Sequence, residues 1–159
     1  MRRLLKFLHT IGAIGLMGAM ACLLVMLGFA ASPQPLPAYA LLTEAMSRIA
    51  TWIYLPSMAL TLTSGLAAIG INRAFHNAGW AWAKLATGVL MFEWSLAGIV
   101  PPLKSEAERA AAALLAPAEP ALLATTVGPT RNSIWVLLAV AAANVVLGVW
   151  RPRLTRIPD

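Results

Sequence analysis

The chain has 159 residues, of which 60% are hydrophobic and 11% are charged. A soluble domain carries roughly 25% charged residues, so the composition points to a protein that lives in a bilayer. The net charge of +6 does not indicate a nucleic-acid partner, because the basic residues sit in short clusters at the ends of apolar segments. We therefore expect the lipid bilayer, and no nucleic acid, as the partner of this chain.

Four apolar segments are long enough to cross the bilayer as helices. The first includes an unbroken apolar run from Ile11 to Ala30, which at ~1.5 Å per residue matches a ~30 Å hydrocarbon core. That run exceeds the apolar part of a secretory signal, so we expect a retained helix. The predicted spans are residues 4–29, 52–71, 80–100 and 132–150. The whole chain, residues 1–159, is predicted to be one all-α domain, a four-helix antiparallel transmembrane bundle.

Prolines mark the expected breaks before the second span and after the third. Pro33, Pro35 and Pro37 predict a short loop, because proline cannot continue a helical hydrogen-bond ladder. A helix is expected to restart near Tyr39 and to lie at the outer interface over residues 41–49. Within it, Glu44 and Arg48 are four residues apart and can pair on one face. Pro56 then falls near the start of the second span, where a kink can form.

The longest segment outside the predicted spans is residues 101–131. Pro101 and Pro102 are expected to stop the third span. Residues 105–115 are alanine-rich and begin with Ser105, a residue type favoured at helix N-caps. We therefore expect one extramembrane amphipathic helix there, followed by a loop.

The distribution of Lys and Arg predicts the orientation. Eight basic residues fall on one side of the predicted bundle: Arg2, Arg3, Lys6, Arg73, Lys84, Arg151, Arg153 and Arg156. Four fall on the other side: Arg48, Lys104, Arg109 and Arg131. Because cytoplasmic ends carry the excess of basic residues, both termini are expected in the cytoplasm of a bacterial cell, with the protein in the inner membrane.

Polar residues at one depth form the first candidate site. Counting from the cytoplasmic ends of the spans brings Ser64, Thr87 and Asn144 to the level of His9, within roughly 10 Å of the inner interface. Arg73 and Lys84 lie just below this layer. The layer is either a pocket that opens toward the cytoplasm or a set of hydrogen bonds that joins the helices.

His9 is the residue of this layer with the most chemistry. A neutral histidine nitrogen is a good axial ligand for haem iron, and Met20 is one of four methionines that place thioethers deeper in the bundle. The other three are Met17, Met58 and Met91. Small residues follow His9 on the same helix, where they either leave room for a flat ligand or let another helix approach. These are Gly12, Ala13, Gly15, Gly18 and Ala19. Cys22, the one cysteine, is expected to be a small packing residue.

Glu93 is the one acidic residue well inside a predicted span. Such a residue is a functional hypothesis by default. By depth its expected neighbours are Met17 to Met20, Ser57 and Met58, and Leu137 and Leu138, none of them basic. Glu93 is therefore expected to be hydrogen-bonded to Ser57 or to backbone, to belong to a proton path, or to face a subunit interface.

Three stretches resemble a family of small bacterial integral membrane proteins of unknown function: KFLHTIGAIGLMGAM (6–20), AFHNAGWAWAKLATGVL (74–90) and ANVVLGVWRPRL (143–154). More remotely, His9 and the W-x-K of Trp82 to Lys84 resemble the HemJ-type protoporphyrinogen oxidases and the CopD copper-resistance membrane domain. The HemJ resemblance implies haem b, with His9 as an axial ligand. It further implies that Lys84, with Arg73, partners a haem propionate or a porphyrin carboxylate.

The residues leave three functions open. The first is a membrane protein that binds haem or another tetrapyrrole through His9. The second is a non-enzymatic scaffold or accessory subunit, as a homo-oligomer or within a larger membrane complex. The third is a small proton-coupled transporter that uses Glu93. No nucleophile–base pair, phosphate loop or dinucleotide fingerprint assigns a reaction.

Overall fold

The structure is a computed structural model that describes residues 2–32, 34–115 and 123–150. Within these ranges all regular secondary structure is helical, without a strand, as the sequence predicts. Four helical rods are long and apolar enough to cross a membrane: Arg3–Ala30, Leu36–Ile71, Gly79–Leu115 and Val127–Trp150. The expectation of an all-α protein with four helices that are long and apolar enough to cross a membrane is therefore confirmed for the described residues. The expected stop at residues 151–153 lies outside the described residues.

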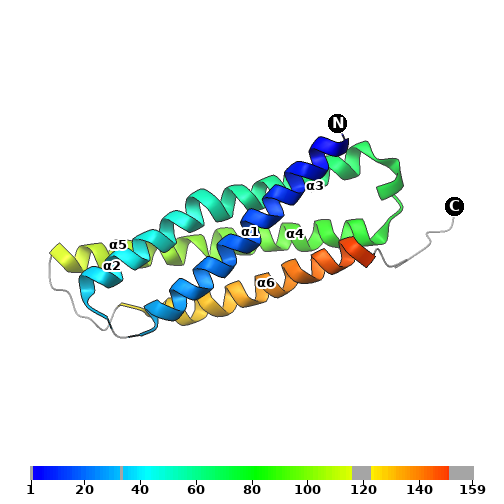
Figure 1. The fold of residues 1–159 in the computed structure, drawn as a ribbon. Helices are drawn as coiled ribbons and strands as arrows, with labels where there is room; N and C mark the ends of the chain where they lie inside the picture. The colour runs from blue at the N-terminus through cyan, green and yellow to red at the C-terminus, as the bar shows by residue number, and fades with distance from the viewer. Residues whose placement is uncertain (1, 33, 116–122, 151–159) are drawn as a thin grey trace.

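The four rods lie side by side and alternate in direction (Figure 1). Helix α1 (Arg2–Ala30) packs most extensively on α3 (Leu55–Ile71), and α6 (Val127–Trp150) contacts both α1 and α4 (Gly79–Gly98). The start of α1 and the end of α6 lie at the same end as the α3–α4 connection, which we name the α3–α4 end. At the opposite end, the α2–α5 end, α2 (Leu36–Ile49) packs on α5 (Val100–Leu115).

The second rod is longer and more continuous than the sequence predicts. Helix α2 runs without interruption into a π-helical segment, Ala50–Tyr54, and then into α3. The N–H of Leu55 donates to the carbonyl of Ala50, five residues earlier. This wider turn precedes Pro56, which has no N–H to offer a regular helix. The interfacial helix and the second span are thus one rod, and Glu44 and Arg48 form the expected pair on it at 2.6 Å.

The third rod corrects the predicted helix boundary at Pro101 and Pro102. Helix α4 ends at Gly98, Ile99 breaks the ladder, and α5 begins at Val100. Both prolines lie in the first turn of α5, where a missing N–H breaks no hydrogen bond. The predicted end of the third span at residue 100 thus lies two residues beyond the end of α4, and the prolines begin α5 instead of stopping α4. The expected N-cap at Ser105 is wrong. That side chain lies inside α5, and its hydroxyl donates to the carbonyl of Pro102.

The second and third rods have 36 and 37 residues, or roughly 55 Å each, against a hydrocarbon core of ~30 Å. The excess length carries α2 and α5 beyond the other two rods.

A buried carboxylate, Glu106, holds the α2–α5 end together. It accepts hydrogen bonds from the Tyr39 hydroxyl, the Ala124 N–H, the Arg109 guanidinium and the Thr126 hydroxyl, at 2.6, 2.6, 2.6 and 2.9 Å.

Two glycines on α1 set how closely the rods approach. A Cβ atom on Gly12 would stand 2.9 Å from the backbone nitrogen of Thr61, and one on Gly15 would collide with the Ser57 hydroxyl. Gly18, in contrast, has nothing within 4 Å of that position. Close packing of α1 on α3 therefore depends on Gly12 and Gly15, as small residues allow between membrane helices. Cys22 is exposed on α1, so the expected packing role is wrong.

Candidate functional site

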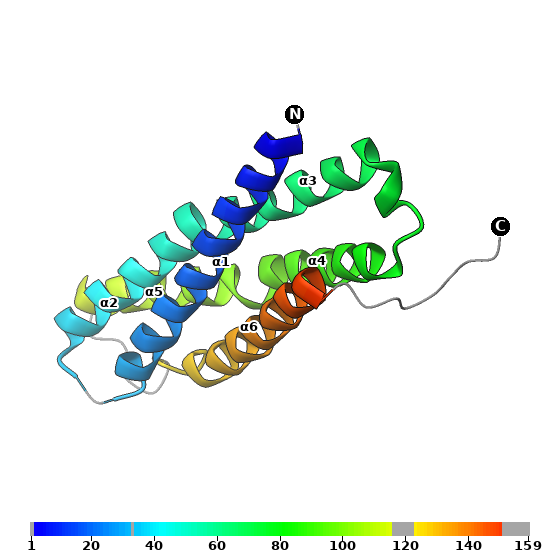
Figure 2. The same cartoon turned by 45° about the vertical axis from the view of Figure 1, so that its right-hand side comes forward.

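A cavity of about 420 Å³ lies at the α3–α4 end, between α1, α3, α4 and α6. At this end α1 and α3 diverge from α4 and α6 (Figure 2). Most lining residues are apolar, and the polar ones are Lys6, His9, Thr61, Asn72, Lys84 and Asn144. The volume is within the ~300–1,000 Å³ typical of small-molecule sites, which are likewise apolar with a few polar groups.

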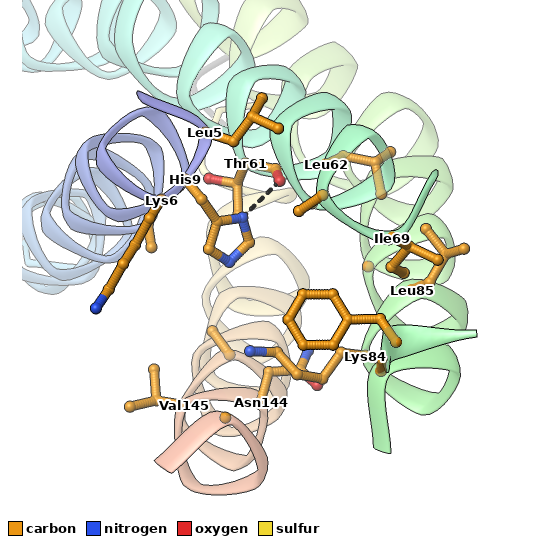
Figure 3. A pocket seen from close by; sticks show the side chains of 18 of the residues that line it. Leu5, Lys6, His9, Thr61, Leu62, Ile69, Lys84, Leu85, Asn144 and Val145 are labelled. Carbon is orange, nitrogen blue, oxygen red and sulfur yellow. Dashed lines mark hydrogen bonds between the residues drawn. The ribbon is translucent and has the colours of Figure 1, made fainter. Parts of the chain in front are cut away.

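His9 occupies the α1 wall of this cavity (Figure 3). Its Nδ1 lies 2.9 Å from the carbonyl oxygen of Thr61 on α3. A carbonyl only accepts hydrogen bonds, so Nδ1 carries the proton and donates it. In the neutral ring, Nε2 then holds a lone pair, and in Figure 3 this nitrogen faces the space toward Lys84 and Asn144. The ring lies against Gly65 of α3, where a Cβ would be in van der Waals contact with Nδ1 at 3.4 Å.

Lys84 and Asn144 form the opposite wall. The Lys84 ammonium lies against α6, where a Cβ on Gly148 would stand 2.8 Å from its Nζ. The Thr87 hydroxyl lies 2.9 Å from Oδ1 of Asn144, which joins α4 to α6. The wall thus combines a cation with a side-chain amide whose oxygen is held by a neighbouring helix.

The structure brings together some of the predicted site residues and separates others. Ser64 is buried behind His9, with its hydroxyl 3.4 Å from Nδ1. Met20 is fully buried in the core and does not line the cavity. Arg73 is exposed on the short 3₁₀ turn Arg73–Phe75 at the same end and does not line the cavity either. The candidate site therefore reduces to His9, Lys84 and Asn144, with Ser64 and Thr87 supporting them.

Two features of the site were not predicted as such. Lys6 lines the cavity, although in the sequence it served only as a marker of topology. Its position three residues before His9 places it on the same helix face, which is the signal that could have identified it. Phe75 and Trp80 also line the cavity, and their rings meet edge to face with centroids 5.4 Å apart.

Glu93 lies outside the cavity, exposed on the outer face of α4. Of the alternatives that the sequence leaves open, the hydrogen bond to Ser57 is not formed: Ser57 lies against Gly15 on α1, whereas Glu93 is exposed. Within the described ranges Glu93 makes no hydrogen bond or ion pair.

The chemistry available in the cavity is that of one imidazole and nearby cations within apolar walls. No group of three or more His, Cys, Asp or Glu residues that could hold a metal ion is found in the described part of the chain. A metal that enters the cavity bound in a larger planar molecule needs only one axial ligand, which the Nε2 atom of His9 can supply. No family model, no curated protein and no solved structure matches the chain.

Proposed function

We propose that this protein binds haem b or another tetrapyrrole, in the cavity at the α3–α4 end, through the Nε2 atom of His9. The observation that carries the proposal is the hydrogen bond from His9 Nδ1 to the Thr61 carbonyl. Histidines that bind metals usually donate their second ring N–H to a carbonyl or carboxylate, which fixes the ring and its tautomer. The bond therefore leaves one oriented lone pair directed into an apolar cavity.

The walls of the cavity fit the remaining surface of such a ligand. A tetrapyrrole has a flat apolar ring and carboxylate side chains. Apolar residues from four helices suit the ring, while Lys6 and Lys84 supply positive charge for the carboxylates. Bound in this way, the tetrapyrrole iron would supply redox or gas-binding chemistry, and the chain would supply its axial ligand and orientation. Glu93 has no part in this proposal.

We further propose that the protein lies in a bacterial inner membrane as a four-helix antiparallel bundle, with both termini in the cytoplasm. Support comes from the basic residues at the α3–α4 end, which include Arg3, Lys6, Arg73 and Lys84. The excess of basic residues over those of the α2–α5 end is the pattern of a cytoplasmic face. The cavity then opens at the cytoplasmic side of the bilayer.

The test is an absorption spectrum of the detergent-purified protein after expression with a haem precursor. The wild type should show a Soret band, and His9→Ala should lose it while the protein remains folded. His76→Ala is the matched control, because His76 is the second histidine and lies in the α3–α4 connection, outside the cavity lining. A colourless wild type, or an unchanged spectrum in His9→Ala, would overturn the proposal and favour a scaffold function.

A further inference from the structure

A second hollow, polar in character, lies where the second rod packs on α5, and we name it the α2–α5 groove. Its polar lining residues are Glu44, Ser47, Arg48, Thr51 and Lys104. The first four follow one another at spacings of three, one and three residues, which places them on one face of the rod. The groove therefore combines two cations, one carboxylate and two hydroxyls, and none of these residues lines the cavity around His9.

The α2–α5 groove lies at the depth of phospholipid headgroups. Trp52 and Val100 also line it, and they are the residues at which the second and third predicted spans meet this end. Arg48 and Lys104 each lie four residues further outward, or ~6 Å along their helices. Headgroups extend the ~30 Å hydrocarbon core to ~40–45 Å, which is ~5–8 Å on each side. Both cations thus reach the level of the lipid phosphates, above an exposed tryptophan of the kind found at this boundary.

The charged groups of the groove keep hydrogen-bonding capacity beyond their own ion pairs. The pair between Arg48 and Glu44 joins Nε of the guanidinium to Oε1 of the carboxylate. The terminal guanidinium nitrogens carry further N–H donors, and the second carboxylate oxygen is a further acceptor. Lys104 approaches Glu108 only to 4.0 Å, and both side chains are 67% exposed. A ligand with both charges can therefore add to these groups without breaking the existing pairs.

The two hydroxyls of the groove are also available. Within the described ranges, Ser47 and Thr51 make no side-chain hydrogen bond. Thr43, one turn earlier on the same helix, instead donates to the carbonyls of Tyr39 and Ala40. Thr51 also belongs to the π-helical segment Ala50–Tyr54, and such wide turns are frequent at functional sites.

We propose that the α2–α5 groove binds the headgroup of an ethanolamine phospholipid from the leaflet at the α2–α5 end. The lipid phosphate is an anion, which Arg48 and Lys104 match with charge-assisted hydrogen bonds. The ethanolamine ammonium is a cation with N–H donors, which the carboxylate of Glu44 matches. A headgroup that carries phosphate alone would leave Glu44 facing a like charge. The lining is therefore complementary to a zwitterion, and the site is separate from the cavity of the proposed function.

The first test compares lipids with identical acyl chains. Detergent-purified protein is titrated with dioleoyl phosphatidylethanolamine, phosphatidylcholine or phosphatidylglycerol, and bound lipid is measured by native mass spectrometry. The ethanolamine lipid should bind about fivefold or more tightly than the choline lipid, because a trimethylated ammonium has no N–H to donate. The glycerol lipid, which has no ammonium, should also bind more weakly. Equal or tighter binding of either competing lipid would overturn the proposal.

The second test removes the carboxylate. Glu44→Gln should bring the affinities for the ethanolamine and choline lipids to within about twofold of each other, because the neutral amide loses the charge that favours the ammonium. Glu108→Gln is the matched control: Glu108 is likewise an exposed carboxylate beside a basic residue, but it does not line the groove. Thermal melting without added lipid checks that both variants are folded. A preference that persists in Glu44→Gln, or that Glu108→Gln loses equally, would contradict the assignment.

The third test removes the cations. The double variant Arg48→Gln, Lys104→Gln should weaken binding of both lipids roughly tenfold or more, since both depend on the phosphate contacts. Arg73→Gln removes an exposed cation at the α3–α4 end and should leave both affinities unchanged. An equal loss in Arg73→Gln would show general attraction to phospholipids in place of a site at the groove, and would overturn the proposal.

Discussion

The hydroxyl of Tyr39 donates a 2.6 Å hydrogen bond to Glu106, and this bond joins α2 to α5 across 67 residues of sequence. Glu106 is 1% exposed, and its two oxygens receive three further donors from α5 and from the residues before α6. An ionised carboxylate only accepts hydrogen bonds, so its two oxygens can accept from all four donors at once. A single acidic side chain thus holds α2, α5 and the residues before α6 together at the α2–α5 end.

We expect Glu106→Gln to destabilise the protein by about 2–4 kcal/mol. The amide nitrogen of glutamine is a donor, so it would face two of the four donors that now surround the carboxylate, and the Arg109 guanidinium would lose its counter-charge. Unfolding in detergent by a denaturant titration measures the loss. Glu108→Gln is the control, because Glu108 is exposed and lies 4.0 Å from Lys104, where a pair contributes little. Equal losses in the two variants would contradict this role of Glu106.

Gly12→Ala should destabilise the contact between α1 and α3 by about 1–3 kcal/mol. The new methyl group would stand 2.9 Å from the Thr61 nitrogen and 3.0 Å from the Ser57 carbonyl oxygen. Both are backbone atoms of α3, so the helices must separate. Gly18→Ala has open space at the same helix and should be neutral or stabilising by up to about 1 kcal/mol. The same denaturant titration distinguishes the two variants. If Gly12→Ala leaves the free energy of unfolding unchanged, close contact between α1 and α3 at this position does not contribute to stability.

Depth along each helix could be predicted from the sequence, whereas rotation about the helix axis could not. Counting residues from the ends of the spans placed His9, Ser64 and Asn144 at one level. In the structure His9 and Asn144 line the cavity, and the Ser64 hydroxyl lies 3.4 Å from His9 Nδ1. The same counting placed Glu93 well inside a span but left open whether it faces the bundle or its outside, and the structure has it exposed on α4. In a bilayer both the buried and the lipid-facing sides of a helix are apolar, so no polar face marks the outside.

Proline was the second limit of sequence reasoning. Pro101 and Pro102 signal a helix boundary, but the same residues are acceptable in a first helical turn. A helix does end just before this pair, at Gly98, but whether a second helix begins at once depends on the tertiary contacts of the residues after it. Here α5 is held on α2 by Tyr39 and Glu106. That contact spans distant segments, so local sequence carried no sign of it.

The orientation can be tested by labelling single cysteines with a membrane-impermeant maleimide, in a Cys22→Ala background. Asn77 lies in the α3–α4 connection and Ser32 just after α1, and both are exposed. If the α3–α4 end is cytoplasmic, Ser32→Cys should be labelled in intact spheroplasts, and Asn77→Cys only after lysis. Labelling of Asn77→Cys before lysis would reverse the proposed topology.

Ala141→Leu should reduce ligand binding without reducing stability. Ala141 lies on α6, is 7% exposed and lines the cavity. The larger side chain can therefore extend into the cavity and occupy part of its volume of about 420 Å³. We expect haem affinity to fall roughly tenfold or more, as the loss of ~1.4 kcal/mol of contact would produce. The free energy of unfolding should stay the same or rise, since filling an apolar cavity adds contacts.

Ala143→Leu is the control for this substitution, because Ala143 lies two residues further along α6 and is exposed. It adds the same side chain to the same helix outside the cavity, so haem titration followed by absorbance should match the wild type. His9 is untouched in both variants, which separates the volume of the cavity from its iron ligand. If Ala141→Leu binds haem as tightly as Ala143→Leu, the ligand lies elsewhere, and His9 then serves to hold α1 on α3 through Thr61.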